Sequence, residues 1–179
     1  MNELILMKYG EIALKGLNKS SFEDILLKNI RWRMRDMGRL RLRKAQSTIY
    51  LEPEDPERFD FDEAMDRLTK IFGIASISRA LVVEKSLDAI QKEICGYLED
   101  QLSSARTFKV ETRRSDKQFP LKSPEISAEV GGTILSRFRN LQVDVHNPEL
   151  VVNVEIRDFG AYIHAGSIPG AGGMPVSSS

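Results

Sequence analysis

The 179-residue sequence predicts an α+β protein made of two consecutive mixed units. Three observations support this prediction. Short apolar segments with strand periodicity alternate with longer segments whose apolar residues recur at helical spacing. Recognisable helix-start residues precede the helical segments. The order of the elements also changes near residue 83, which divides the chain into a first unit of residues 1–83 and a second of 84–165.

The sequence of the first half of the first unit predicts a strand, a helix and a β-hairpin. An apolar run at 3–9 is the first strand. Ser20 followed by Glu23 has the pattern of a capping box, so a helix is expected to begin at Ser20. Its apolar residues are expected to face a sheet: Phe22, Ile25, Leu26, Ile30, Met34 and Met37. Arginine and leucine alternate strictly over residues 39–43, so this segment is expected to be a strand with Leu40 and Leu42 on its buried side. Residues 48–52 are expected to form the second strand of a hairpin with it.

The rest of the first unit predicts a second helix and a fourth strand. Asp60 and Glu63 start the helix, and Gly73 is expected to stop it. Its apolar stripe is Met65, Leu68, Ile71 and Phe72. The strand follows at 77–84. Two helices on one face of a four-stranded sheet, in the order β-α-β-β-α-β, are typical of a ferredoxin-like domain.

The second unit predicts a different α/β arrangement. Ser86 caps a helix whose apolar positions are Leu87, Ile90, Ile94, Leu98 and Leu102. A strand at 107–113 precedes a helix that starts with Ser123 as N-cap and Pro124 as its first residue. Strands are expected at 142–146, 150–157 and 159–166. The remaining residues, 166–179, are mostly small and are expected to form a linker.

Composition excludes several classes of protein. No apolar run approaches the roughly 18 to 20 residues of a membrane span, and the N-terminus lacks the features of a secretory signal, so a cytoplasmic location is expected. The single cysteine, Cys95, excludes an internal disulfide and is expected to be a packed thiol. His146 and His164 are the two histidines, and we expect structural hydrogen bonds for both and no metal site.

The formal net charge is zero, but the charges are segregated along the chain. Residues 28–44 carry a net charge of +7 and residues 54–66 a net charge of −6. The segment from Arg106 to Lys122 contains six basic residues and only two acidic ones. Because local fields steer a charged partner, a neutral total does not exclude nucleic acid.

The basic segment around residue 115 predicts a binding loop for single-stranded RNA. Arg113 and Arg114 point to opposite sides of a strand, so they reach one ligand only if the strand ends there and the chain turns at Ser115 and Asp116. The loop then meets a helix N-terminus, which favours an anion. Phe119 could stack on a base. The same residues would also fit a solvated strand edge with Phe119 in a core.

A second basic stripe is expected on the first helix and the strand that follows it. Lys28, Arg31 and Arg35 share the polar face of that helix, and three further arginines occupy alternate positions at 39–43. The stripe could bind a polyanion or only face water. Gly131 and Gly132 inside the second unit's later helix suggest close approach of the backbone to the sheet or to a ligand.

Two motifs resemble a known family. KYGEIALKGLNKSSFE, residues 8–23, resembles the opening of the tRNA 4-thiouridine synthases, which are tRNA uracil sulfurtransferases. The segment from Phe108 through VDVHNPELVVNVEIRDFGAYIHAG resembles a THUMP domain, a tRNA-binding module that several RNA-modifying families share. The end, SIPGAGGMPVSSS, resembles the linker that precedes the ATP-pyrophosphatase domain of the sulfurtransferases. Neither the S-G-G-x-D-S loop of that domain nor a G-x-x-x-x-G-K-[ST] loop occurs in the sequence.

The resemblance implies that this chain binds tRNA and that catalysis belongs to a further domain. In that family, the enzyme uses ATP and Mg to adenylate a tRNA uridine. A cysteine desulfurase supplies the sulfur, and this sulfur transfer also serves thiamine synthesis. The full-length enzyme could form a homodimer. Carried over to this sequence, the residues that would hold the 3′ acceptor end are Lys109, Arg113, Arg114, Lys117, Phe119 and Lys122. The residues that would touch the acceptor stem are Lys8, Lys15 and Asn18, whereas Tyr9 is expected in the core. A standalone tRNA adaptor and a ferredoxin-like metabolite-binding module remain alternatives.

Overall fold

The computed structural model describes residues 2–10 and 18–172, which group into two compact units. The first unit contains the described residues up to Arg79 together with 167–172, and the second contains 80–166. Within the described ranges, no helix is both long and apolar enough to cross a membrane.

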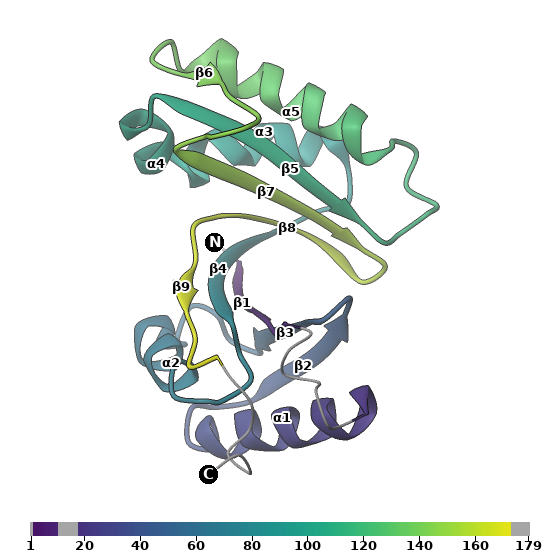
Figure 1. Cartoon of the computed structure of the whole chain (residues 1–179), viewed down its shortest axis with the longest axis vertical. Helices are drawn as coiled ribbons and strands as arrows, with labels where there is room; N and C mark the ends of the chain where they lie inside the picture. The colour runs from purple at the N-terminus through teal and green to yellow at the C-terminus, as the bar shows by residue number, and fades with distance from the viewer. Residues whose placement is uncertain (1, 11–17, 173–179) are drawn as a thin grey trace. The chain divides into compact units, whose positions relative to one another are not determined.

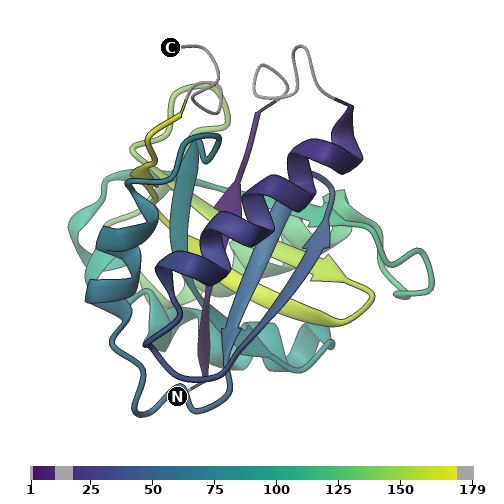
Figure 2. The same ribbon diagram turned by 90° about the horizontal axis from the view of Figure 1, so that it is seen from below.

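The first unit has the predicted order of elements. These are β1 (Glu3–Lys8), α1 (Lys19–Arg33), β2 (Leu40–Ala45), β3 (Thr48–Pro53), α2 (Phe61–Leu68) and β4 (Ser76–Val83). The strand order is β2-β3-β1-β4, with β3 antiparallel to both β1 and β2. Both helices lie on the same side of these strands (Figures 1 and 2). The ferredoxin-like prediction is therefore confirmed.

Two helix ends in the first unit differ from the prediction. Asn18, not Ser20, caps α1, because its side-chain oxygen accepts a hydrogen bond from the Ser21 backbone N–H at 2.8 Å. The capping-box interpretation of Glu23 is wrong, since this carboxylate is buried elsewhere. Helix α2 begins after Asp60 as predicted but ends at Leu68.

The turn that follows α2 explains the glycine at 73. Gly73 has a φ of 99°, and a Cβ there would lie 2.9 Å from the Phe22 ring. Both the backbone conformation and the space therefore require glycine. Ile25 and Phe72, which were expected to be covered, are 42% and 48% exposed, so these two predictions are wrong.

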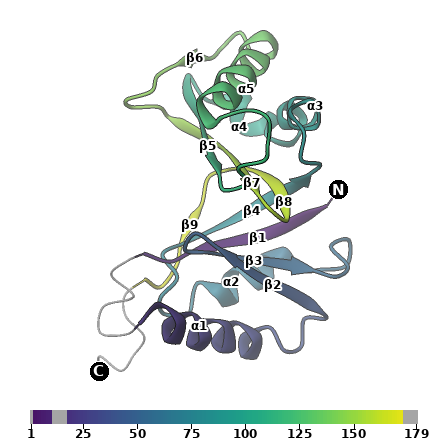
Figure 3. The same cartoon turned by 90° about the vertical axis from the view of Figure 1, so that its right-hand side faces the viewer.

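The second unit contains a parallel strand pair joined by a helix. Its elements are α3 (Leu87–Tyr97), α4 (Glu99–Ser104), β5 (Thr107–Arg114), α5 (Ser123–Arg137), β6 (Gln142–Val143), β7 (Leu150–Arg157) and β8 (Gly160–Ala165). Strands β6 and β7 pair in parallel with β5, and β8 is antiparallel to β7. The last residues of β4 pair with β8. Helices α3, α4 and α5 lie on one side of these strands (Figures 1 and 3).

Three predictions for the second unit are corrected. The expected helix breaks at Leu98 into α3 and α4. The N-cap of α5 is Lys122, one residue before the predicted Ser123. The strand expected at 142–146 is only two residues long, because Asp144 accepts hydrogen bonds from the backbone N–H groups of His146 and Asn147 and turns the chain.

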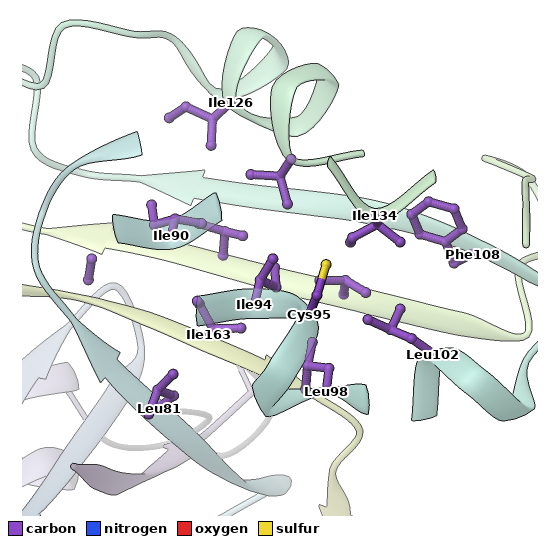
Figure 4. Packing of buried hydrophobic residues seen from close by; sticks show 14 of the residues in the cluster. Leu81, Ile90, Ile94, Cys95, Leu98, Leu102, Phe108, Ile126, Ile134 and Ile163 are labelled. Atoms are coloured by element: carbon purple, nitrogen blue, oxygen red, sulfur yellow. The ribbon is translucent and has the colours of Figure 1, made fainter. Parts of the chain in front are cut away.

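The core of the second unit is apolar and continuous between helices and sheet (Figure 4). Ile126 and Ile134 from α5 and Ile90 and Ile94 from α3 belong to this cluster. Cys95 is 2% exposed within this cluster, and burial raises the pKa of its thiol. The packed-thiol prediction is confirmed.

The residues after 165 do not all behave as the expected linker. Ile168 and Pro169 form β9, which pairs with the start of β4. The Gly170 N–H donates to the Ala75 carbonyl at 2.9 Å, and a Cβ at Gly170 would lie 2.2 Å from the Ile74 carbonyl oxygen. The small residues of this segment therefore allow it to lie directly against the backbone of the first unit.

Candidate nucleic-acid interface

The loop between β5 and α5, residues 115–122, extends past the end of β5 (Figure 1). Pairing with β7 ends where the Ser115 N–H donates to the Ile156 carbonyl at 2.9 Å. The chain then turns at Asp116, whose carboxylate accepts from the Gln118 N–H at 3.0 Å. The strand thus ends and turns where the sequence predicted.

Lys85 fixes this turn from a different part of the chain. Its Nζ donates to the Asp116 carboxylate at 2.6 Å and to the Asp158 carbonyl at 2.9 Å. The hydrogen bond from Lys85, with a second from the Gln118 backbone, holds the pKa of Asp116 below its ordinary value. Sequence reasoning missed Lys85, since nothing in its local pattern indicates a partner 31 residues away.

Arg113 and Arg114 are not brought together. Arg114 lies on the same side of β5 as Thr112. The Thr112 hydroxyl forms a hydrogen bond of 2.8 Å with the Ser127 hydroxyl of α5, so the helix covers this side of the strand. The Arg114 Nη1 donates to the Asp116 carbonyl at 2.7 Å, and its Nε is buried without a partner. Arg114 is half-buried and braces the loop, so its guanidinium is less open to RNA than the sequence predicted.

The opposite side of β5 carries the other strand cations. Lys109 is half-buried and Arg113 is exposed. Arg113 lies 3.8 Å from the Glu111 carboxylate, with 49% of its side chain exposed. Such a contact at the surface contributes little, so Arg113 remains available to an anion.

Phe119 does not present its ring to a ligand. It is 8% exposed and belongs to the core of the second unit. The expectation that a base stacks on Phe119 is therefore corrected: the ring anchors the loop to the core. Lys117 and Lys122, on either side of it, are exposed, and within the described residues neither forms an ion pair.

The start of α5 is less open to an anion than expected. The Lys122 backbone N–H donates to the Glu125 carboxylate at 3.0 Å. Pro124 has no N–H group, and Glu125 adds a negative charge in the first turn. The cationic side chains, more than the helix dipole, thus set the field at this loop.

Of the residues predicted in the first unit, Lys8 and Asn18 lie in the described part of the chain. Lys8 is half-buried at the end of β1 and already has a partner. Asn18 caps α1, and Lys15 lies outside the described residues.

Tyr9 and Glu23 form a buried pair beside these residues. Tyr9 is 3% exposed, as expected for the core, and its hydroxyl donates to the Glu23 carboxylate. Burial, followed by the bond to Glu23, raises the pKa of Tyr9. Burial opposes the charge on Glu23, but hydrogen bonds from Tyr9 and Lys44 hold the Glu23 pKa below its ordinary value. The pair ties the end of β1 to α1.

The two histidines differ in their surroundings. His164 is buried, and its Nε2 lies 2.7 Å from the Glu155 carboxylate, which also accepts from Arg157 at 2.9 Å. His146 is exposed, and its backbone N–H donates to Asp144. Within the described residues, no group of three or more histidine, cysteine or acidic side chains could hold a metal ion.

Comparison with known proteins identifies both units. Residues 4–78 match the family described as the ThiI ferredoxin-like domain, and residues 84–164 match the THUMP domain. The chain is thus a ThiI-type ferredoxin-like domain followed by a THUMP domain. Its sequence is similar to the N-terminal part of probable tRNA sulfurtransferases, as the relatives below show.

A probable tRNA sulfurtransferase of Acetivibrio thermocellus is 42% identical over the whole of this chain. The chain spans only 46% of that relative's length. Among solved structures, PH1313 from Pyrococcus horikoshii has a TM-score of 0.80 and 34% identity, and the match covers 99% of this chain and 58% of that one. A 4-thiouridine synthetase in complex with RNA and ATP has a TM-score of 0.75 and 28% identity, covering 99% of this chain and 44% of that one.

Proposed function

We propose that this chain binds tRNA and holds the unpaired 3′ end of the acceptor against the β5–α5 loop of the THUMP domain. The observation that carries the proposal is a group of exposed cations: Arg113 near the end of β5, and Lys117 and Lys122 on the following loop, which Phe119 and Lys85 fix in place. A fixed loop loses little conformational entropy on binding, and its free cations can neutralise phosphates. The 4-thiouridine synthetase solved with RNA matches 99% of this chain with a TM-score of 0.75.

The whole protein would be a tRNA uracil 4-sulfurtransferase. In that protein the two domains would position one uridine for ATP- and Mg-dependent thiolation by a further domain, with sulfur supplied by a cysteine desulfurase, and two copies could act together. The present sequence contains no S-G-G-x-D-S loop to hold ATP. We therefore expect the 179-residue chain to bind tRNA without modifying it.

The test compares intact tRNA with tRNA that lacks its unpaired 3′ nucleotides. Anisotropy of a labelled tRNA gives both dissociation constants at low salt. We expect trimming to weaken binding by roughly tenfold or more, because charge-assisted contacts to the end phosphates are lost. Equal affinity for the two RNAs would contradict the proposal. A melting temperature raised by an amino acid or nucleotide, with no tRNA binding, would favour the metabolite-binding alternative.

A further inference from the structure

The outer face of α1 carries an exposed tryptophan that the function above does not use. Trp32 is the single tryptophan of the sequence, and it is 64% exposed. A single exposed apolar side chain is common on a protein surface, so the surroundings of Trp32 decide whether it marks a binding site. The helix that presents it covers the sheet of the ferredoxin-like domain (Figure 2).

Arg35 lies against one face of the Trp32 ring. Its Cζ is 3.9 Å from the ring centroid, and its Nη1 donates to the Trp32 backbone carbonyl at 2.8 Å. The cation–π contact and the hydrogen bond together hold the guanidinium in place. The positive charge is thus fixed beside the ring, while most of the Trp32 side chain stays open to solvent.

Two further cations lie on the same flank of α1. At about 100° per residue, Lys28 and Arg31 fall within roughly 100° of Trp32 on one side of α1, and Arg35, which follows the end of the helix at Arg33, lies against the Trp32 ring. All three cations are exposed, and in the part of the chain that the structure describes none of them forms an ion pair. Asp24 is the acid nearest this flank on α1, so the flank keeps a net positive charge.

Trp32 also lines a groove of about 850 Å³ between α1 and α2, together with Arg35 and Phe72. The carboxylates in this groove already have cationic partners. Asp36 and Glu63 bond to Arg67 at 2.5 and 2.9 Å, and Asp66 lies 3.5 Å from Lys70. The acids therefore offset the groove's own cations, and their effect on the Trp32 flank is reduced.

We propose that Trp32 is a stacking platform for an unpaired nucleotide, and that Lys28, Arg31 and Arg35 bind the phosphates beside it. The ferredoxin-like domain would then make its own contact with single-stranded RNA. An open ring among like charges is the combination that binds single strands, whereas the core of a protein interface is depleted of charge. The inference relies on the proposed function in one respect, namely that the physiological ligand is RNA.

Fluorescence of Trp32 gives a direct test, because no other tryptophan contributes to the emission. Titration with tRNA and with short oligoadenylate and oligouridylate should quench this emission. By anisotropy of labelled RNA, Trp32→Ala should bind about five- to a hundredfold more weakly, whereas Trp32→Phe should retain most of the affinity. Lys28→Ala combined with Arg31→Ala should lower the log–log salt slope by about 1.4, at about 0.7 per lost single-strand phosphate contact.

Lys92→Ala, which removes an exposed cation from α3, is the matched control and should change neither quantity. Circular dichroism confirms that each variant is folded. If tRNA binds but Trp32 emission and the affinity of Trp32→Ala are unchanged, the platform is refuted and the THUMP-loop function stands. If no RNA binds at all, both proposals fail. If Trp32 emission shifts to the blue as the protein concentration rises in the absence of RNA, this face binds a second copy of the chain, and the stacking-platform proposal is refuted.

Discussion

Removing three exposed cations at the end of β5 and on the loop that follows should change the salt dependence of tRNA binding in a calculable way. Arg113, Lys117 and Lys122 are all exposed, and neither lysine has an ion-pair partner among the described residues. If each neutralises one single-strand phosphate, replacing all three by alanine lowers the log–log slope by about 2, at about 0.7 per contact. Between roughly 50 and 200 mM salt, the wild-type chain should then lose about sixteenfold more affinity than the variant.

The assay is anisotropy of labelled tRNA at a series of salt concentrations, with thermal unfolding to show that the variant remains folded. Arg114→Ala serves as the contrast, since its guanidinium bonds to the Asp116 carbonyl. This change should loosen the loop and lower stability, with little effect on the salt slope. A triple variant with the wild-type slope would show that these cations face only water, and the reasoning would be refuted.

Three further predictions concern the scaffold. Gly132→Ala should raise the unfolding free energy in urea by about 0.5–1 kcal/mol, because a Cβ there meets nothing within 4 Å and alanine favours helix. A loss of stability would contradict this open position. Weaker tRNA binding by a stable variant would mean that a ligand approaches the backbone at Gly132. Phe119→Ala should lower the unfolding free energy by about 3–5 kcal/mol, as expected for a large core side chain, and a loss below about 1 kcal/mol would contradict its anchoring role. The lowered pKa of Asp116 means that its contribution to stability is present above its unfolded pKa, near 3.9, and is lost as the pH falls through the lower folded value. Lys85→Ala should reduce this loss in acid unfolding curves, and an unchanged pH dependence would show that the pair does not act this way.

The order of elements could be predicted because its signals are local. Ser86 and Asp60 cap their helices as expected, each accepting a hydrogen bond from a backbone N–H three residues on. The alternation of Leu40 and Leu42 with arginines places both leucines against the core of the first unit. Caps and periodicity depend on neighbours within a few residues, so a single sequence contains the information.

The roles of individual site residues could not be predicted in the same way. Glu23 has the spacing of a capping box, yet its carboxylate bonds to Tyr9 and Lys44, 14 and 21 residues away. Phe119 follows a basic loop in the sequence, but the core between α5 and the sheet provides space for its ring. Such partners are set by elements that are distant along the chain.

The sequence by itself determined the two-domain α+β organisation, the helical and strand faces, and the cationic character of the loop after β5. Only the tertiary structure decided which of those cations remain available. It directed Arg114 to a backbone carbonyl and left Lys117 and Lys122 exposed. The physical reason is that charge is a property of the residue, whereas a charge's partners and burial depend on contacts between elements that fold together from separate parts of the chain.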